Sequence, residues 1–133
     1  MRLPVGEIVL DASAVLAMVF VEPGGERVRS ELLAQAHSIA MSAVNVCEVM
    51  TRLRRENYIL TAEKAAALLP GVEIVQFDMN EAASAAVLHG SGSPLSLGDR
   101  ACLALAQRLG ATAWTTDKIW AGMAHGVAVE VLR

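Results

Sequence analysis

The sequence has few aromatic residues, few charged residues and only two cysteines. Aromatic residues make up 4% and charged residues 19% of the 133 residues, whereas hydrophobic residues make up 54%. So much apolar surface excludes intrinsic disorder, because such a chain can bury a core. The scarcity of aromatic side chains predicts an aliphatic, alanine-rich core, as where helices pack closely on a sheet. Cys47 and Cys102 lie in separate apolar segments. They are predicted to be small buried residues in a reducing compartment and not part of a disulfide framework.

The chain also lacks a basic excess and a long hydrophobic run. Its formal net charge is −3 and its pI about 5.6, so any contact with nucleic acid would have to be local. The most apolar stretch, residues 8–21, is shorter than the ~20 residues of a membrane span and contains Asp11. With that aspartate inside it and only Arg2 ahead of it, the stretch is also a poor signal peptide. We therefore expect a cytoplasmic protein without a membrane segment, folded as one domain over residues 1–133.

Short apolar runs alternate with helical segments along the sequence. The strand-like runs are 7–10, 37–41, 72–77, 111–115 and 127–132. The helical segments are 12–20, 26–35, 42–57, 61–70, 80–89, 96–109 and 117–123, with a loop at 90–94. Thr61 is expected to cap the start of one helix and Gly110 the end of another. This alternation predicts a parallel α/β sheet covered on both faces, with right-handed crossovers. The functional crevice of such a sheet lies at the carboxyl ends of its strands, near a topological switch.

Acidic residues recur at the ends of these predicted strands and at the starts of the helices. Asp11 ends the first strand, Asp78 follows the third, Asp117 follows the fourth, and Asp99 lies in the first turn of an apolar helix. Glu48 lies inside the helix that starts at residue 42 and has aliphatic neighbours in sequence. A glutamate enclosed by such surface is not expected to be fully buried without a partner.

Helix capping is the simplest alternative explanation for three of these acids. Asp11 and Asp117 could each cap the helix that follows them. Ser96 and Asp99 have the spacing of a capping box, with aspartate in place of glutamate. Capping does not explain Glu48, which lies about two turns into its helix and not on an obviously solvated face. It also does not explain why three such starts lie where α/β folds place their active sites.

Polar residues near the acids favour a metal site. One helical stripe spaced by three and four residues consists of Ser42, Asn45, Glu48 and Arg52. Ser13 follows Asp11 by two residues, and Thr115 precedes Asp117 by two. Four acids with hydroxyl and amide support are typical of an oxygen-ligand site for Mg²⁺ or Mn²⁺. Without a cation their charges would repel and raise at least one pKa.

Zinc is disfavoured as the metal. His37, His89 and His125 show no spacing typical of zinc ligands, and the two cysteines are isolated. We expect the three histidines to be surface or loop residues.

Four motifs carry a resemblance to a known family. They are DASA at 11–14, SAVNVCEV at 42–49, SLGDRACLALA at 96–106 and TTDKIW at 115–120. In this order they resemble the PIN-domain ribonucleases, and among these the VapC-type toxins of bacterial toxin–antitoxin pairs. The resemblance implies a parallel-sheet α/β/α sandwich. It also implies Mg²⁺ or Mn²⁺ as cofactor, an antitoxin protein as partner and a homodimer.

The resemblance also assigns roles to residues. It implies that the catalytic, metal-binding acids are Asp11, Glu48, Asp99 and Asp117, supported by Ser13, Asn45 and Thr115. The implied reaction is cleavage of single-stranded or looped RNA that leaves a 5′-phosphate and a 3′-hydroxyl. One or two divalent ions would activate a water for in-line attack on the phosphodiester.

Candidate RNA contacts are few. Arg52, Arg100 and Lys118 are the candidates for binding phosphate, whereas Arg54 and Arg55 are better explained as a solvated helix face. Trp120 could stack on a base, although packing against the sheet is the simpler interpretation.

Three alternatives remain open from the sequence. A phosphatase or phospho-acceptor domain could use Asp11 as a nucleophile, but haloacid-dehalogenase-like sites need a second aspartate where this chain has Ser13. A receiver-like domain would need paired acids near the first strand, and Asp78 has no such pair. A non-catalytic interaction module is the third alternative.

Overall fold

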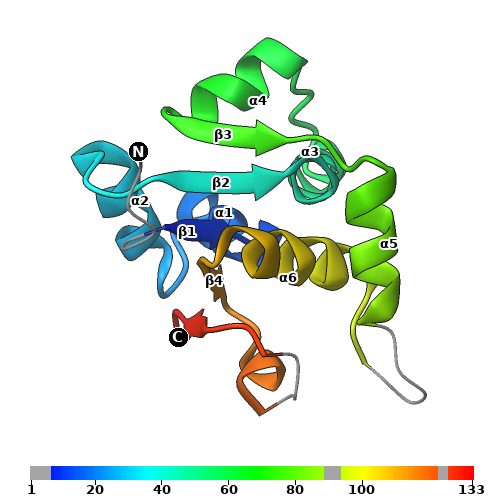
Figure 1. The fold of residues 1–133 in the computed structure, drawn as a ribbon. Helices are drawn as coiled ribbons and strands as arrows, with labels where there is room; N and C mark the ends of the chain where they lie inside the picture. The colour runs from blue at the N-terminus through cyan, green and yellow to red at the C-terminus, as the bar shows by residue number, and fades with distance from the viewer. Residues whose placement is uncertain (1–6, 89–93, 123–125) are drawn as a thin grey trace.

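The chain folds around a five-stranded sheet in which every pair of neighbouring strands is parallel (Figure 1). The computed structural model describes residues 7–88, 94–122 and 126–133. The strands are β1 (Ile8–Leu10), β2 (Ile39–Ser42), β3 (Val72–Val75), β4 (Thr112–Thr115) and β5 (Val129–Val131). Their order across the sheet is β3-β2-β1-β4-β5. The parallel α/β fold predicted from the alternation of segments is confirmed, with β3 and β5 shorter than the runs that predicted them.

The helices also follow the predicted order. They are α1 (Ala12–Val19), α2 (Gly25–Ala34), α3 (Ala43–Arg55), α4 (Ala62–Leu68), α5 (Met79–Val87) and α6 (Leu97–Leu109). The last helical segment is a 3₁₀ helix, η1 (Lys118–Gly122). The Thr61 hydroxyl accepts a hydrogen bond from the Lys64 amide at 3.2 Å, and Gly110 ends α6 with a left-handed φ of 63°. Both predicted caps are therefore confirmed, while the predicted loop at 90–94 lies, except for Pro94, outside the described residues.

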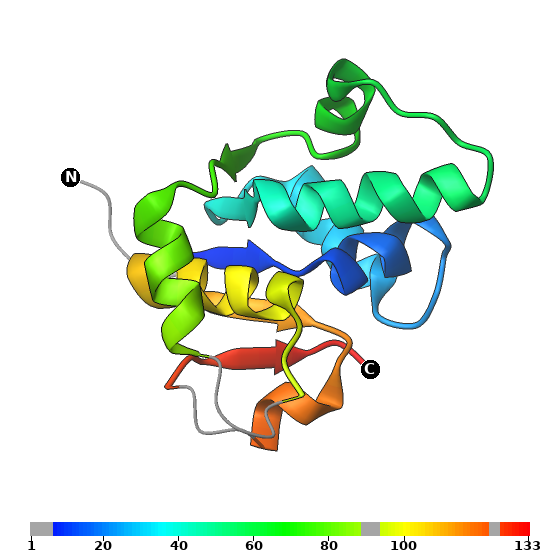
Figure 2. The same ribbon diagram turned by 90° about the vertical axis from the view of Figure 1, so that its right-hand side faces the viewer.

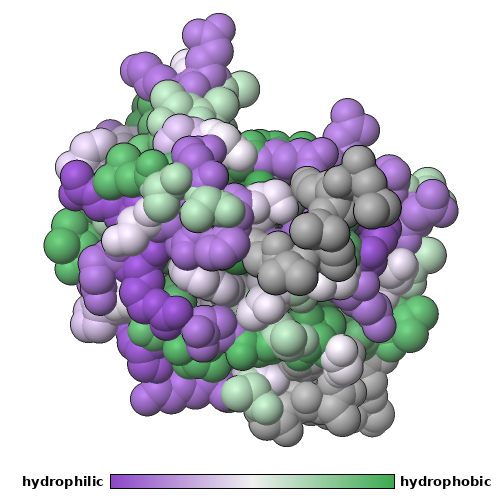
Figure 3. Space-filling view, turned by 60° about the vertical axis from the view of Figure 1, so that its left-hand side comes forward, coloured by the Kyte–Doolittle hydropathy of each residue, from purple (hydrophilic) through white to green (hydrophobic). Residues whose placement is uncertain are grey.

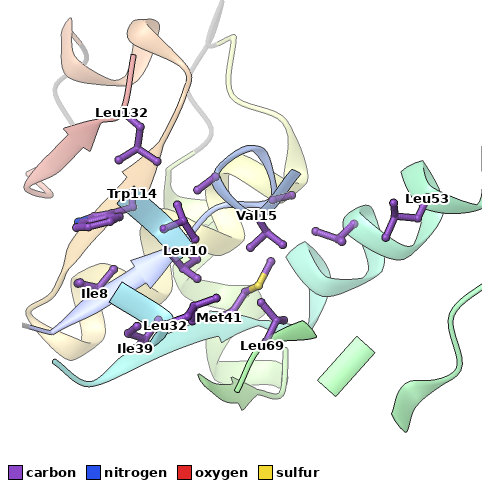
Figure 4. Packing of buried hydrophobic residues seen from close by; sticks show 14 residues of the cluster. Ile8, Leu10, Val15, Leu32, Ile39, Met41, Leu53, Leu69, Trp114 and Leu132 are labelled. Carbon is purple, nitrogen blue, oxygen red and sulfur yellow. The ribbon is translucent and has the colours of Figure 1, made fainter. Parts of the chain in front are cut away.

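Alternate residues of the strands face opposite layers of helices. Ile8, Leu10 and Trp114 belong to one buried cluster with α1, α2 and α3 (Figure 4). Val9 and Ala113 belong to a second cluster with α6 and Trp120. Figure 1 shows α6 in front of the sheet, with α1 and α2 behind it. Both faces are therefore covered, as expected for a parallel sheet.

The core is largely aliphatic, and one of the two cysteines takes no part in it. Cys102 in α6 is fully buried, whereas Cys47 in α3 is exposed, so the prediction of two buried cysteines is wrong for Cys47. The buried residues of α3 are spaced by four: Asn45, Val49 and Leu53. Position 47 lies off this stripe and lines an open cavity of about 310 Å³ on the outer side of α3. An apolar neighbourhood in sequence did not show which face of α3 is turned to the sheet.

The described surface mixes polar and apolar residues. On the face shown in Figure 3, hydrophilic and hydrophobic residues are interspersed. Among the exposed large hydrophobic residues are Val21, Met79 and Val87. Within the described residues, no helix has both the length and the apolar character needed to cross a membrane.

Candidate active site

The predicted acids gather at the carboxyl ends of the three central strands. The chain continues from β1 to β2 and β3 on one side, then places β4 and β5 on the other. The topological switch therefore lies between β1 and β4, where α/β folds form their functional crevice. Figure 2 shows the end of β1 leading directly into α1. Asp11 occupies this junction, Thr115 ends β4, and α3 and α6 pack against each other nearby.

Asp11 is held by two hydroxyl groups, one from the first turn of α1 and one from the end of β4. Its side chain is buried, with 5% of the residue exposed. Oδ2 accepts hydrogen bonds from the Ser13 hydroxyl at 2.6 Å and from the Thr115 hydroxyl at 3.0 Å. Although Asp11 is the N-cap residue of α1, its side chain accepts no hydrogen bond from the helix backbone. The capping interpretation is therefore wrong for Asp11, because the carboxylate is turned towards β4.

The same hydroxyls tie the Asp117 segment to β1. Thr115 is fully buried, and its Oγ1 accepts a hydrogen bond from the Asp117 amide at 3.0 Å. The Ser13 hydroxyl oxygen accepts a bond from the Thr116 amide, also at 3.0 Å. Each hydroxyl thus donates to the Asp11 carboxylate and accepts from the backbone after β4. The two groups fix the ends of β1 and β4 relative to each other.

Capping is confirmed for the other two aspartates. The Ser96 amide donates to Asp99 Oδ2 at 2.9 Å, and the Asp99 amide donates to Ser96 Oγ at 3.1 Å, which forms the reciprocal capping box. Asp117 Oδ1 accepts a bond from the Ile119 amide at 3.0 Å, at the start of η1. Both acids are half-buried. Asp99 and Asp117 can therefore cap their helices and still lie near the other acids.

Electrostatic coupling shows that the acids are neighbours. Burial raises the pKa of Asp11 from 3.8 to about 6, and the charges of Asp99 and Glu48 add to the rise. The hydrogen bonds from Ser13 and Thr115 oppose this rise in pKa without cancelling it. Burial and the charge of Asp117 raise the pKa of Asp99, while its bonds to Ser96 and the charge of Arg100 lower it. The pKa of both aspartates is raised, but burial is the larger cause and the predicted charge repulsion the smaller one.

The Cys102 thiol in the second turn of α6 lies within range of these charges. Burial raises its pKa well above the usual value, and the charges of Asp11, Asp99 and Glu48 contribute. Cys102 is fully buried in the second core cluster, so this side of α6 packs against the sheet.

Glu48 differs from its predicted environment. It was expected to be enclosed by aliphatic surface, but it is exposed, one position off the buried stripe of α3. Its carboxylate is nevertheless held, because Asn45 Nδ2 donates to Oε1 at 2.9 Å. The same amide group donates to the Gly98 carbonyl at 3.0 Å and so joins α3 to α6. Sequence reasoning missed Gly98; a glycine inside a helix, where alanine is favoured, was the available signal.

The donor set fits a hard divalent cation, although the ligands are not closed around one point. In the described part of the chain, no three His, Cys, Asp or Glu side chains meet closely enough to hold a single ion. All the donors on this edge are oxygens, as Mg²⁺ and Mn²⁺ prefer. Among the described residues Asn45 Oδ1 is buried without a hydrogen-bond partner. The oxygen donors together with this unpaired amide oxygen therefore suit such an ion.

The candidate RNA contacts lie in different settings. Arg52 is exposed, with its guanidinium 4.9 Å from the ring centroid of Phe20 and bonded to Glu56 at 3.3 Å. Arg100 is half-buried and donates to the Ala85 carbonyl at 3.4 Å, and Lys118 is exposed.

Two further predictions from the sequence concern Trp120 and the histidines. Trp120 is fully buried, so the packing interpretation is confirmed and base stacking is wrong. His37 bonds to Glu31 at 2.9 Å, and His89 and His125 lie outside the described residues.

Comparisons with known proteins agree with this geometry. The family model of the PIN domain matches residues 8–126. A solved VapBC2 complex from Rickettsia felis, bound to promoter DNA, has 17% identity and a TM-score of 0.68, covering 93% of this chain and 97% of that one. A toxin–antitoxin complex from Klebsiella pneumoniae has 20% identity and a TM-score of 0.68, covering 95% and 98%.

A third solved structure is that of VapC20 from Mycobacterium tuberculosis, a toxin that cleaves the sarcin–ricin loop. It has 16% identity and a TM-score of 0.65, covering 89% of this chain and 97% of that one. No curated protein matches the sequence. At these identities the solved structures show a shared fold, which confirms the expected α/β/α sandwich.

Proposed function

Because this chain belongs to the PIN domain family, we propose that it is a divalent-metal-dependent endoribonuclease and the toxin of a toxin–antitoxin pair. The observation that carries the proposal is Asp11 at the topological switch, buried, held by two hydroxyls and raised in pKa by burial, with a smaller contribution from the charges of Asp99 and Glu48. The similar fold of VapC20, which cleaves the sarcin–ricin loop, supports RNA as the substrate class.

Four acids would hold Mg²⁺ or Mn²⁺, namely Asp11, Glu48, Asp99 and Asp117. A bound divalent ion supplies an activated water and stabilises charge on the phosphodiester. The residues around the acids act by positioning them. Ser13 and Thr115 fix the Asp11 carboxylate, and the bond from the Asp117 amide to Thr115 places the Asp117 segment beside it.

The phosphatase alternative loses its support at position 13. The Ser13 hydroxyl supports the carboxylate where a second aspartate would be needed.

The cognate antitoxin is proposed to insert a basic segment at the acidic edge. A guanidinium there would pair with carboxylates that otherwise repel one another. Similar solved structures include toxin–antitoxin complexes from two organisms, which supports such a partner. Homodimerisation is proposed from the family resemblance alone.

The nuclease proposal is tested with purified protein and a structured RNA. We expect cleavage with Mg²⁺ or Mn²⁺ and none in EDTA, with activity restored when the metal is added back. The matched control is Asp11→Asn, which keeps the size and hydrogen-bond acceptor of the side chain but removes its charge. Undiminished cleavage by metal-free protein would remove the metal mechanism.

The toxin proposal is tested in cells by inducing the chain with and without the adjacent reading frame. We expect growth arrest that the adjacent frame relieves and that Asp11→Asn abolishes. Equal arrest with and without that frame, or no arrest, contradicts the assignment as a toxin.

A further inference from the structure

Gly98 lies directly against the Glu48 carboxylate. It lies in the first turn of α6, and a Cβ added there would overlap both carboxylate oxygens of Glu48, so that the end of this side chain would have to move. Its backbone does not require glycine, because the positive-φ glycines of the described chain are at other positions. Glycine is also a poor helix former compared with alanine. The missing side chain at position 98 is therefore explained by the space that Glu48 occupies.

Asn45 holds the same carboxylate from the other side. It is fully buried, and its side-chain amide donates one hydrogen bond to Glu48 Oε1 and one to the Gly98 carbonyl. Both partners are acceptors, so a flipped amide would place an oxygen against two oxygens. Within the described residues Asn45 Oδ1 has no partner, although leaving such an atom unpaired destabilises a fold. The Asn45 amide group therefore keeps both hydrogen bonds although its oxygen is left unpaired.

Without these contacts Glu48 would be a mobile surface side chain. It is exposed on α3, and a long charged side chain in water samples many rotamers. The Asn45 amide and the bare surface of Gly98 restrict the carboxylate to the start of α6.

We propose that Gly98 and Asn45 form a carboxylate seat, which places Glu48 for the divalent cation and sets how tightly the acidic edge binds it. Both are positioning residues, since they act through Glu48. The proposal rests on the proposed function only in assuming that the acids bind a cation. Loss of a residue that orients a metal ligand typically weakens metal binding by about 10–100-fold.

The test measures Mn²⁺ binding to metal-free protein by calorimetry and by electron paramagnetic resonance, without RNA. Gly98→Ala and Asn45→Ala are each expected to weaken Mn²⁺ binding by about 10–100-fold. Gly98→Ala should keep its helix content in EDTA, because alanine favours the helix. The control is Val49→Ala, a buried truncation one turn further along α3, which should lower the melting temperature and leave Mn²⁺ affinity unchanged.

The outcomes separate the seat from the proposed function. A parent protein that binds no Mn²⁺ contradicts the proposed function itself. A parent that binds, with both folded variants binding equally well, overturns the seat. Equal weakening by Val49→Ala also overturns it, because the loss would then follow general destabilisation. If Gly98→Ala fails to fold, the comparison of Asn45→Ala with Val49→Ala decides.

Discussion

Asp11 and Asp99 lie at the starts of two different helices, and their carboxylates are used in opposite ways. At the start of α6, Asp99 exchanges hydrogen bonds with Ser96, three residues away. At the start of α1, Asp11 stands in the N-cap position but bonds to Thr115, 104 residues away. One carboxylate stabilises its own helix, and the other joins two strands. An aspartate before a helix is therefore ambiguous until its burial is known: Asp11 is 5% exposed, whereas Asp99 is half-buried.

The largest expected effect comes from Asp11→Asn. Removing the charge should lower metal-dependent cleavage by about 100-fold or more, since a metal ion contributes several kcal/mol to such reactions. The same change should stabilise the metal-free protein at pH 8. A pKa raised from 3.8 to about 6 corresponds to about 3 kcal/mol that opposes folding when the group is ionised.

The stability gained by Asp11→Asn should depend on pH. Below pH 4 the carboxyl is protonated in both the folded and the unfolded states, so it does not disfavour folding. As the pH rises through 4 to 6, the unfolded state ionises first and the fold loses stability. Urea unfolding in EDTA at pH 4 and pH 8 measures the difference between parent and variant. If the stability gain does not increase with pH, the raised pKa of Asp11 is contradicted.

The next effect comes from Thr115, on the long-range side of the comparison. Thr115→Val removes the hydroxyl that donates to Asp11 and accepts from the Asp117 amide. We expect a loss of about 1–3 kcal/mol in the free energy of unfolding, because the partly buried Asp117 amide loses its acceptor and the buried Asp11 carboxylate loses a donor. The pKa of Asp11 should also rise further. Thr115→Ser keeps the hydroxyl and serves as the control; if it behaves like Thr115→Val, the hydroxyl is not the cause.

The smallest effect comes from Asp99, on the local side. Asp99→Asn keeps an oxygen that can accept the Ser96 amide, whereas Asp99→Ala removes the cap as well as the charge. In EDTA we expect the alanine variant to be less stable than the asparagine variant by about 1 kcal/mol. Both should lose cleavage and the stabilisation by Mn²⁺. Thermal melts with and without Mn²⁺ measure the stability of each variant. If Asp99→Asn still cuts RNA, Asp99 serves only as a helix cap.

The sequence could predict the local interactions of this protein but not those between residues far apart in the chain. The capping box at Ser96 and the C-cap at Gly110 are local, so they could be predicted from spacing. The positions of the acids at the strand ends followed from the alternation of strands and helices. The bonding of Asp11 to Thr115 depends on β4 lying beside β1, which spacing along the chain does not show. The wrong expectations for Cys47 and Glu48 have one cause, the rotation of α3 on the sheet, which is set by its packing against other elements.

The placement of β1 between β2 and β4 has a consequence for the order of synthesis. Asp11 is translated before its hydroxyl partner on β4, which follows 104 residues later. At a translation rate of about 5–20 residues per second, roughly 5–20 s separate the two. Asp117 comes later still, so a ribosome that is making this chain carries an unfinished acidic edge during that interval. The nuclease site that we propose is therefore incomplete until β4 and the segment after it have been made.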